Sequence, residues 1–126
     1  MEAKELRIGN YAFTRNNKII RIDHASIENL VLWERTKYSK TPPVKPIPLN
    51  EDWVIGNPNF LIDANNAYSI KLGSTFITIY PPGYMGPFQK CWCWIYDKFK
   101  FVDLPYIHSL QNLYNVLSGG NELTIK

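Results

Sequence analysis

The last quarter of the chain carries an apolar repeat that is typical of an amphipathic helix. Between Tyr106 and Leu117, apolar side chains recur at intervals of three and four residues, at Ile107, Leu110, Leu113, Tyr114 and Leu117. Polar residues occupy the opposite face. Asp103 can cap this helix, Pro105 is tolerated in its first turn, and residues 118–120 (Ser-Gly-Gly) are expected to end it. We therefore predict a C-terminal amphipathic helix over Tyr106–Leu117.

Most of the remaining chain favours β-strands. Aromatic residues make up 14% of the 126 residues, and aromatic and β-branched side chains pack well on pleated surfaces. A tight turn is expected at residues 15–18, where two Asn residues favour a hairpin. The predicted strands cover residues 8–13, 19–22, 30–33, 60–62, 68–72, 74–80, 91–96, 99–102 and 122–125. The strands at 91–96 and 99–102 are expected to form a hairpin that turns near Asp97.

Prolines interrupt this pattern between residues 42 and 48. Pro42, Pro43, Pro46 and Pro48 lack the backbone amide that a central strand or a helix needs. A short helix is predicted just after them over Glu51–Ile55, and residues 56–58 (Gly-Asn-Pro) are expected to end it.

These elements predict one α+β domain over residues 1–126. We expect an antiparallel β-rich domain, a meander or small barrel-like sheets, with a short central helix and the C-terminal amphipathic helix. The chain is long enough to bury one core. Its charged start does not resemble a secretory signal, and no apolar run approaches the roughly 20 residues that span a bilayer. A cytoplasmic protein without membrane contact is therefore expected.

Three stretches of the sequence carry a resemblance. They are Glu5-Leu-Arg-Ile-Gly-Asn-Tyr11, the weaker Ile47-Pro-Leu-Asn-Glu-Asp-Trp53, and His108-Ser-Leu-Gln-Asn-Leu-Tyr-Asn-Val-Leu-Ser-Gly119 with Glu122-Leu-Thr-Ile125 after it. Together they resemble a family of small uncharacterised proteins found in Bacteroidetes genomes and in their phages and prophages. Residues 57–103 lie outside the resemblance. It implies no activity and no catalytic residue, but a phage or mobile-element setting favours accessory proteins over metabolic enzymes.

No motif in the sequence points to catalysis, a metal or a cofactor. The only Cys and His residues are Cys91, Cys93, His24 and His108. Zinc sites normally use closely spaced ligand pairs, and these histidines are far apart in the sequence. Two buried cysteines and a histidine on the polar face of the last helix explain the pattern better. We therefore predict no metal and no cofactor, and an enzyme is the third and least favoured function.

Nucleic-acid binding is the second interpretation. Residues 1–46 contain nine Lys and Arg against five Asp and Glu, although the whole chain carries only +3. The segment 35–45 has four basic residues and no acidic one. Under this interpretation the contacts to nucleic acid come from Arg35, Lys37, Tyr38, Lys40 and Lys45.

A binding protein is the favoured interpretation, and residues 81–88 (Pro-Pro-Gly-Tyr-Met-Gly-Pro-Phe) are its basis. Three prolines restrict this loop, while its aromatic residues and Met are types enriched at interfaces. Together with the aromatic hairpin that follows, the predicted contact residues are Tyr84, Met85, Phe88, Trp92 and Trp94. We expect a non-catalytic accessory protein that captures a protein partner or a small ligand. The sequence is also compatible with a homo-oligomer.

Overall fold

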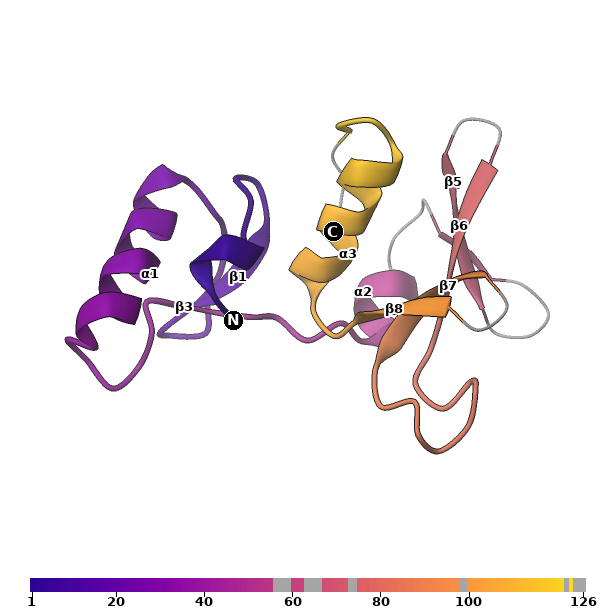
Figure 1. Cartoon of the computed structure of the whole chain (residues 1–126), viewed down its shortest axis with the longest axis horizontal. Helices are drawn as coiled ribbons and strands as arrows, with labels where there is room; N and C mark the ends of the chain where they lie inside the picture. Colours follow the sequence, from indigo (N-terminus) through magenta and orange to yellow (C-terminus); the bar gives the residue numbers. More distant parts are fainter. Residues whose placement is uncertain (56–59, 63–66, 73–74, 98–99, 122, 124–126) are drawn as a thin grey trace.

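The structure is a computed structural model that describes residues 1–55, 60–62, 67–72, 75–97, 100–121 and 123 (Figure 1). Its elements, in chain order, are η1 (Ala3–Glu5), β1 (Tyr11–Thr14), β2 (Ile19–Arg21), α1 (His24–Thr36), β3 (Val44–Lys45), α2 (Glu51–Ile55), β4 (Phe60–Ile62), β5 (Tyr68–Leu72), β6 (Thr75–Tyr80), β7 (Trp92–Asp97), β8 (Lys100–Leu104) and α3 (Ile107–Leu117). The fold is α+β and rich in antiparallel strands, as predicted, and its two sheets are open rather than closed into a barrel.

The N-terminal sheet has the strand order β2-β1-β3, and its first two strands form the predicted hairpin. Its third strand is Val44–Lys45, so the prediction of a strand at residues 30–33 is wrong. Those residues belong to α1, because the carboxylate of Asp23 caps this helix by accepting a 2.8 Å bond from the Ser26 amide. Once the helix starts there, Ile27, Leu30 and Val31 fall on one face and pack against the sheet.

The second sheet has five antiparallel strands in the order β4-β5-β6-β7-β8. Its register gives the sheet an inner face, which packs against buried residues of α2, α3 and Leu123. The buried side chains of this face are Phe60, Tyr68, Ile70, Ile77, Ile79, Trp92 and Leu104. The outer face carries the alternate residues, among them Phe76, Thr78, Cys93, Phe101 and Asp103.

The C-terminal helix is confirmed as α3, but its predicted cap is not. Tyr106 is the N-cap and makes no side-chain cap bond, while Asp103 lies within β8. The chain before α3 is instead held by backbone bonds to the proline segment, from the Leu49 amide to Pro105 at 3.0 Å and from the Ile107 amide to Ile47 at 2.9 Å. Helix α2 is also confirmed. Residues 56–58, at which α2 is predicted to end, and, apart from Leu123, the predicted strand at 122–125 lie outside the described residues.

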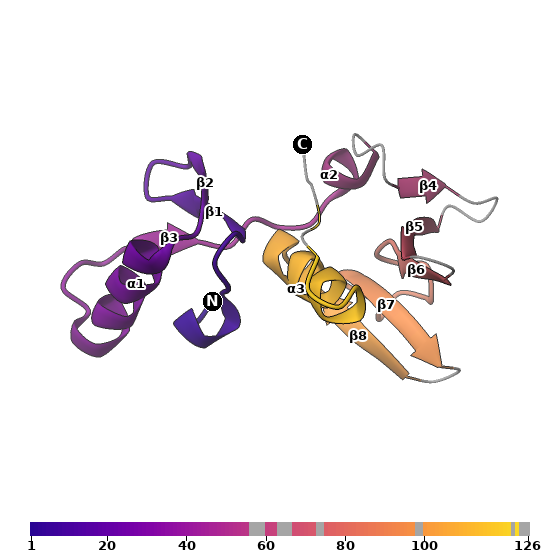
Figure 2. The same cartoon turned by 90° about the horizontal axis from the view of Figure 1, so that it is seen from above.

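Helix α3 lies between the N-terminal elements and the five-stranded sheet in both views of the chain (Figures 1 and 2). The buried apolar residues accordingly form two clusters, one around each sheet. Where α3 meets residues 5–11, the contact is made of polar groups, and we refer to it as the polar joint. The joint therefore adds hydrogen bonds to the apolar contact that Tyr11 and Phe13 of β1 make with the cluster of the five-stranded sheet.

Gln111 is the centre of the polar joint and is only 1% exposed. Its Oε1 accepts a hydrogen bond from the Tyr11 amide at 2.8 Å, and its Nε2 donates to the Gly9 carbonyl at 3.3 Å. The neighbouring Asn112 accepts from Asn10 Nδ2 and donates to the Glu5 carbonyl, both at 2.9 Å. Side chains of α3 thus bond to residues about a hundred positions earlier, and the two bonds of Gln111 are made to backbone groups in a partly buried setting.

His108 completes the joint one turn earlier on α3. Its side chain is 2% exposed, it stacks on the Tyr106 ring, and its Nε2 lies 3.7 Å from the Glu5 carboxylate. Its Nδ1 has no hydrogen-bond partner among the described residues. Burial lowers the pKa of His108, and this effect outweighs the Glu5 carboxylate, which acts in the opposite direction. The imidazole is therefore held neutral at pH 7.

Candidate functional site

The candidate site begins with the segment 81–90, which connects β6 to β7 and is folded by its own backbone bonds. The Tyr84 amide donates to Pro81, the Gly86 amide to Gly83, and the Gln89 amide to Gly86, each at 3.2 Å. Gly83 and Gly86 have φ values of +84° and +131°, a region that side-chain-bearing residues rarely adopt. The segment is therefore a series of tight turns on which Tyr84, Met85 and Phe88 remain exposed.

Gln89 fixes this segment to the sheet. Its Oε1 accepts from the Met85 amide at 2.8 Å, and its Nε2 lies 3.2 Å from the Tyr80 carbonyl and 3.1 Å from the Cys91 carbonyl. The same nitrogen is 3.3 Å from the sulfur of Cys93. One amide thus joins the loop tip to both strands that the loop connects, which reduces the conformational freedom of the loop before any partner arrives.

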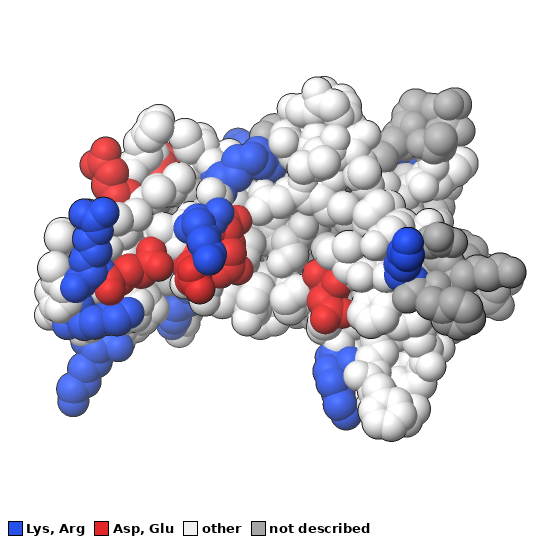
Figure 3. Space-filling model, viewed as in Figure 1, with Lys and Arg blue, Asp and Glu red and all other residues white. Residues whose placement is uncertain are grey.

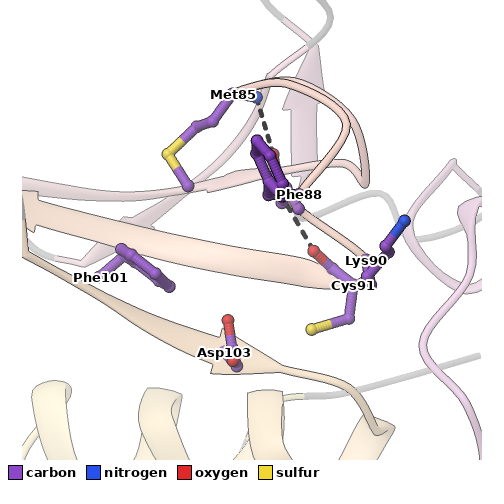
Figure 4. A pocket seen from close by; sticks show the side chains of 7 residues that line it. Met85, Phe88, Lys90, Cys91, Phe101 and Asp103 are labelled. Carbon is purple, nitrogen blue, oxygen red and sulfur yellow. Dashed lines mark hydrogen bonds between the residues drawn. The ribbon is translucent and has the colours of Figure 1, made fainter.

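A pocket of about 360 Å³ lies between this segment and the outer face of the sheet. It is lined by Met85, Phe88, Gln89, Lys90, Cys91, Phe101 and Asp103. In Figure 4, Met85 and Phe88 lie on one side of the space, while Phe101, Asp103 and Cys91 face it from the strands. The pairing of β7 with β8 places Asp103 opposite Cys93 and Phe101 opposite Ile95, which brings these residues to one face.

The two thiols of the site are poor nucleophiles. Burial raises the pKa of the Cys91 thiol, and the negative charge of Asp103 adds to the increase. The same two causes, in the same order, raise the pKa of Cys93 to about 11. Because the thiolate is the reactive form of cysteine, this arrangement disfavours covalent chemistry at neutral pH. The pocket is suited to binding rather than to nucleophilic attack.

The structure brings together only part of the predicted contact set. Met85 and Phe88 line the pocket, and Tyr84 lies beside it, with its ring 4.6 Å from that of Tyr80. Trp92 is 2% exposed and packs on the inner face. Trp94 is half-buried on the same face of the strand.

Sequence reasoning missed Gln89, Cys91, Phe101 and Asp103. The alternation along residues 91–96 does separate the cysteines from the tryptophans, and this signal marks the cysteine face as a second candidate surface. The presence of Phe101 and Asp103 on that face depends on the register between β7 and β8.

The candidate nucleic-acid residues lie at the other end of the molecule. Figure 3 shows Lys and Arg gathered over the N-terminal elements, with few charges over the five-stranded sheet. Lys37 ends α1 with its amine 3.7 Å from the centre of the Trp33 ring, and Lys45 donates to Asn17 at 2.7 Å. The Tyr38 hydroxyl accepts from an Arg side chain at 3.1 Å. Several of these groups are thus engaged within the protein.

Arg35 and Lys40 are the exposed basic residues of this segment for which the described part of the chain gives no such contact. The segment therefore offers fewer groups to a phosphate backbone than its sequence indicates.

The histidines and cysteines are not brought together. His24 begins α1, His108 lies in the polar joint, and the cysteines lie on β7 or next to it. Among the described residues no group of three or more His, Cys, Asp or Glu side chains is placed to hold a metal ion. None of the helices in the described part of the chain is long and apolar enough to cross a membrane.

Comparison with known proteins finds no similar sequence or fold. No protein-family model, no curated protein and no solved structure matches this chain.

Proposed function

We propose that the protein is a non-catalytic binding protein that captures a protein partner through the segment 81–90 and the adjacent pocket. The observation that carries this proposal is the side chain of Phe88, which is 93% exposed on a loop whose shape is already fixed by Gln89. An exposed aromatic ring is unfavourable in water, and burying it on a partner gains roughly 2–3 kcal/mol. A held, projecting aromatic is typical of an interface anchor.

The neighbourhood of Phe88 supports a protein partner more than a small ligand. Tyr84 and Met85 on the same segment and Phe101 on β8 are also exposed. A ring that projects into solvent fits a cavity on another macromolecule, whereas a small-molecule site would enclose its ligand and bury such a ring. The phage or mobile-element setting is part of this proposal only through the sequence resemblance, which favours an accessory protein of this kind.

Photo-crosslinking tests the proposed surface. Phe88 is replaced by p-benzoylphenylalanine, and the same replacement at Val116, which is 74% exposed on α3, serves as the control. We expect a partner that crosslinks from position 88 and not from position 116. With that partner purified, Phe88→Ala should weaken binding by about 30-fold, while Val116→Ala changes it by less than about two-fold.

The same experiment can refute the proposal. Equal crosslinking from both positions, or an affinity that Phe88→Ala leaves unchanged, contradicts it. If position 88 crosslinks only to a second copy of the chain, the surface serves self-association and the proposed capture of another protein is wrong. Neither substitution should change the melting temperature, because both side chains are exposed, so a loss of binding cannot be attributed to unfolding.

A further inference from the structure

The pocket beside Phe88 is lined by a carboxylate, that of Asp103. Asp103 lies on the edge strand β8 and is exposed. Among the described residues, no Lys, Arg or His forms an ion pair with it. Lys90 also borders the pocket, but Figure 4 shows its amine directed away from Asp103. The Cys91 thiol is within hydrogen-bonding reach of this carboxylate, and the remaining lone pairs of Asp103 are available to a ligand.

The neutral groups around Asp103 are those that an alkyl chain ending in a cation would contact. Met85, Phe88 and Phe101 supply apolar walls, and the face of a Phe ring also attracts a cation. The fourth neighbour, Cys91, is held as a neutral thiol, because burial and the nearby carboxylate raise its pKa. A space of about 360 Å³ is sufficient for one long side chain. An anion placed beside Asp103 would be repelled by its carboxylate, and a purely aliphatic group would leave Asp103 without a counter-ion.

We infer that this pocket receives a basic side chain, Lys or Arg, of the captured protein, with Asp103 as its counter-ion and Phe88, Phe101 and Met85 around its methylene stem. This inference rests on the proposed function, since it names the chemistry that the partner presents next to Phe88. It also assigns separate roles within the site. Phe88 supplies the buried apolar contact, and Asp103 selects partners by charge.

Capped single residues test the inference without the partner. The probes are Nα-acetyl-lysine methylamide, Nα-acetyl-arginine methylamide and Nα-acetyl-norleucine methylamide, which share one backbone and differ in the end of the side chain. Titration followed by ¹H–¹⁵N NMR is expected to shift the amides of Cys91, Phe101 and Asp103. We expect the two cationic probes to bind roughly five-fold more tightly than the norleucine probe.

Two matched substitutions isolate the charge. Asp103→Asn keeps the shape of the side chain and should remove the preference for the cationic probes. Glu28→Gln removes one negative charge from the exposed face of α1, far from the pocket, and should leave that preference unchanged. Added salt should also reduce the preference, because an exposed ion pair is screened.

The possible results separate the two proposals. Equal binding of the lysine and norleucine probes at the pocket refutes the basic side chain but leaves partner capture by Phe88 intact. Binding of no probe at the pocket, or a preference that survives Asp103→Asn, also overturns the inference. A charge preference at the pocket together with unchanged partner capture in Phe88→Ala refutes the proposed capture surface and overturns the assignment of the basic side chain to a captured protein, while the preference of the pocket for cations stands.

Discussion

Replacing Gln111 tests whether the polar joint is a structural feature that stabilises the fold. In Gln111→Leu the volume of the side chain is nearly kept, but both of its hydrogen bonds are lost. The Tyr11 amide and the Gly9 carbonyl then lie next to an apolar group, and each unsatisfied buried group costs roughly 1.5–2.5 kcal/mol, in the middle of the usual range. Burial of the additional apolar surface of Leu offsets about 1 kcal/mol of this cost. We expect a net loss of about 2–4 kcal/mol in the free energy of unfolding.

Urea unfolding followed by tryptophan fluorescence and circular dichroism measures this loss. With a slope of about 2 kcal/mol per molar urea, the midpoint should fall by roughly 1–2 M. Asn115→Leu, on the same helix, is the control, since among the described residues the Asn115 side chain bonds only to the Asn121 carbonyl, at 3.3 Å. It should change stability by less than about 1 kcal/mol. A midpoint for Gln111→Leu equal to that of the control would refute the structural role of the joint.

Three further outcomes are expected. Since the pKa of His108 is lowered in the folded state, the unfolded chain takes up a proton first as the pH falls below about 6.5, so stability should decrease there. Urea midpoints at several pH values should show this decrease, and it should be smaller in His108→Asn but not in His24→Asn. Cys93 is buried and has a pKa of about 11, so only about one molecule in a thousand carries the Cys93 thiolate at pH 8. After treatment of the folded protein with iodoacetamide, mass spectrometry should therefore find Cys93 unmodified. If the proposed function is right, fluorescence anisotropy should detect no binding to a single-stranded oligonucleotide at physiological salt. Binding whose salt dependence decreases when Arg35→Gln and Lys40→Gln are combined would favour the nucleic-acid interpretation instead.

The parts of the fold that the sequence predicts are those with strong local signals. Helix α3 could be predicted because its apolar stripe continues over three turns, and the first hairpin could be predicted because of the Asn pair at its turn. The strands β4 to β8 follow from short β-branched and aromatic runs between turn residues. In each case the pattern is contained in a few neighbouring residues, so no knowledge of the tertiary structure is needed.

Helix α1 shows where this local reasoning fails. The run Leu30-Val-Leu-Trp33 has the composition of a strand when it is considered alone. Its helical state depends on a wider window, in which Asp23 provides the cap and Ile27 extends the apolar face. The short strand Val44–Lys45 was missed for the opposite reason, since it is held by pairing with β1 rather than by its own composition.

Only part of the candidate site could be predicted from the sequence. Phe88 and Met85 could be found because a proline-restricted loop that carries apolar residues is unusual. Asp103 could not, because only the register of β8 against β7 places it opposite Cys93 and under the loop. Trp92 illustrates the remaining difficulty, because the alternation of a strand gives two faces but does not say which one the helices cover.

The polar joint and the candidate site are built from different parts of the chain, and two of the stretches that carry the proposed resemblance belong to the joint. The stretches that carry it meet in the structure, since residues 5–11 bond to α3 and the Ile47 to Trp53 segment bonds to the residues just before α3. The pocket is instead built by residues 85–103, which the resemblance does not cover. A variant that keeps residues 1–80 and 91–126 but replaces the segment 81–90 with a short Gly-Ser turn should therefore fold and lose partner capture.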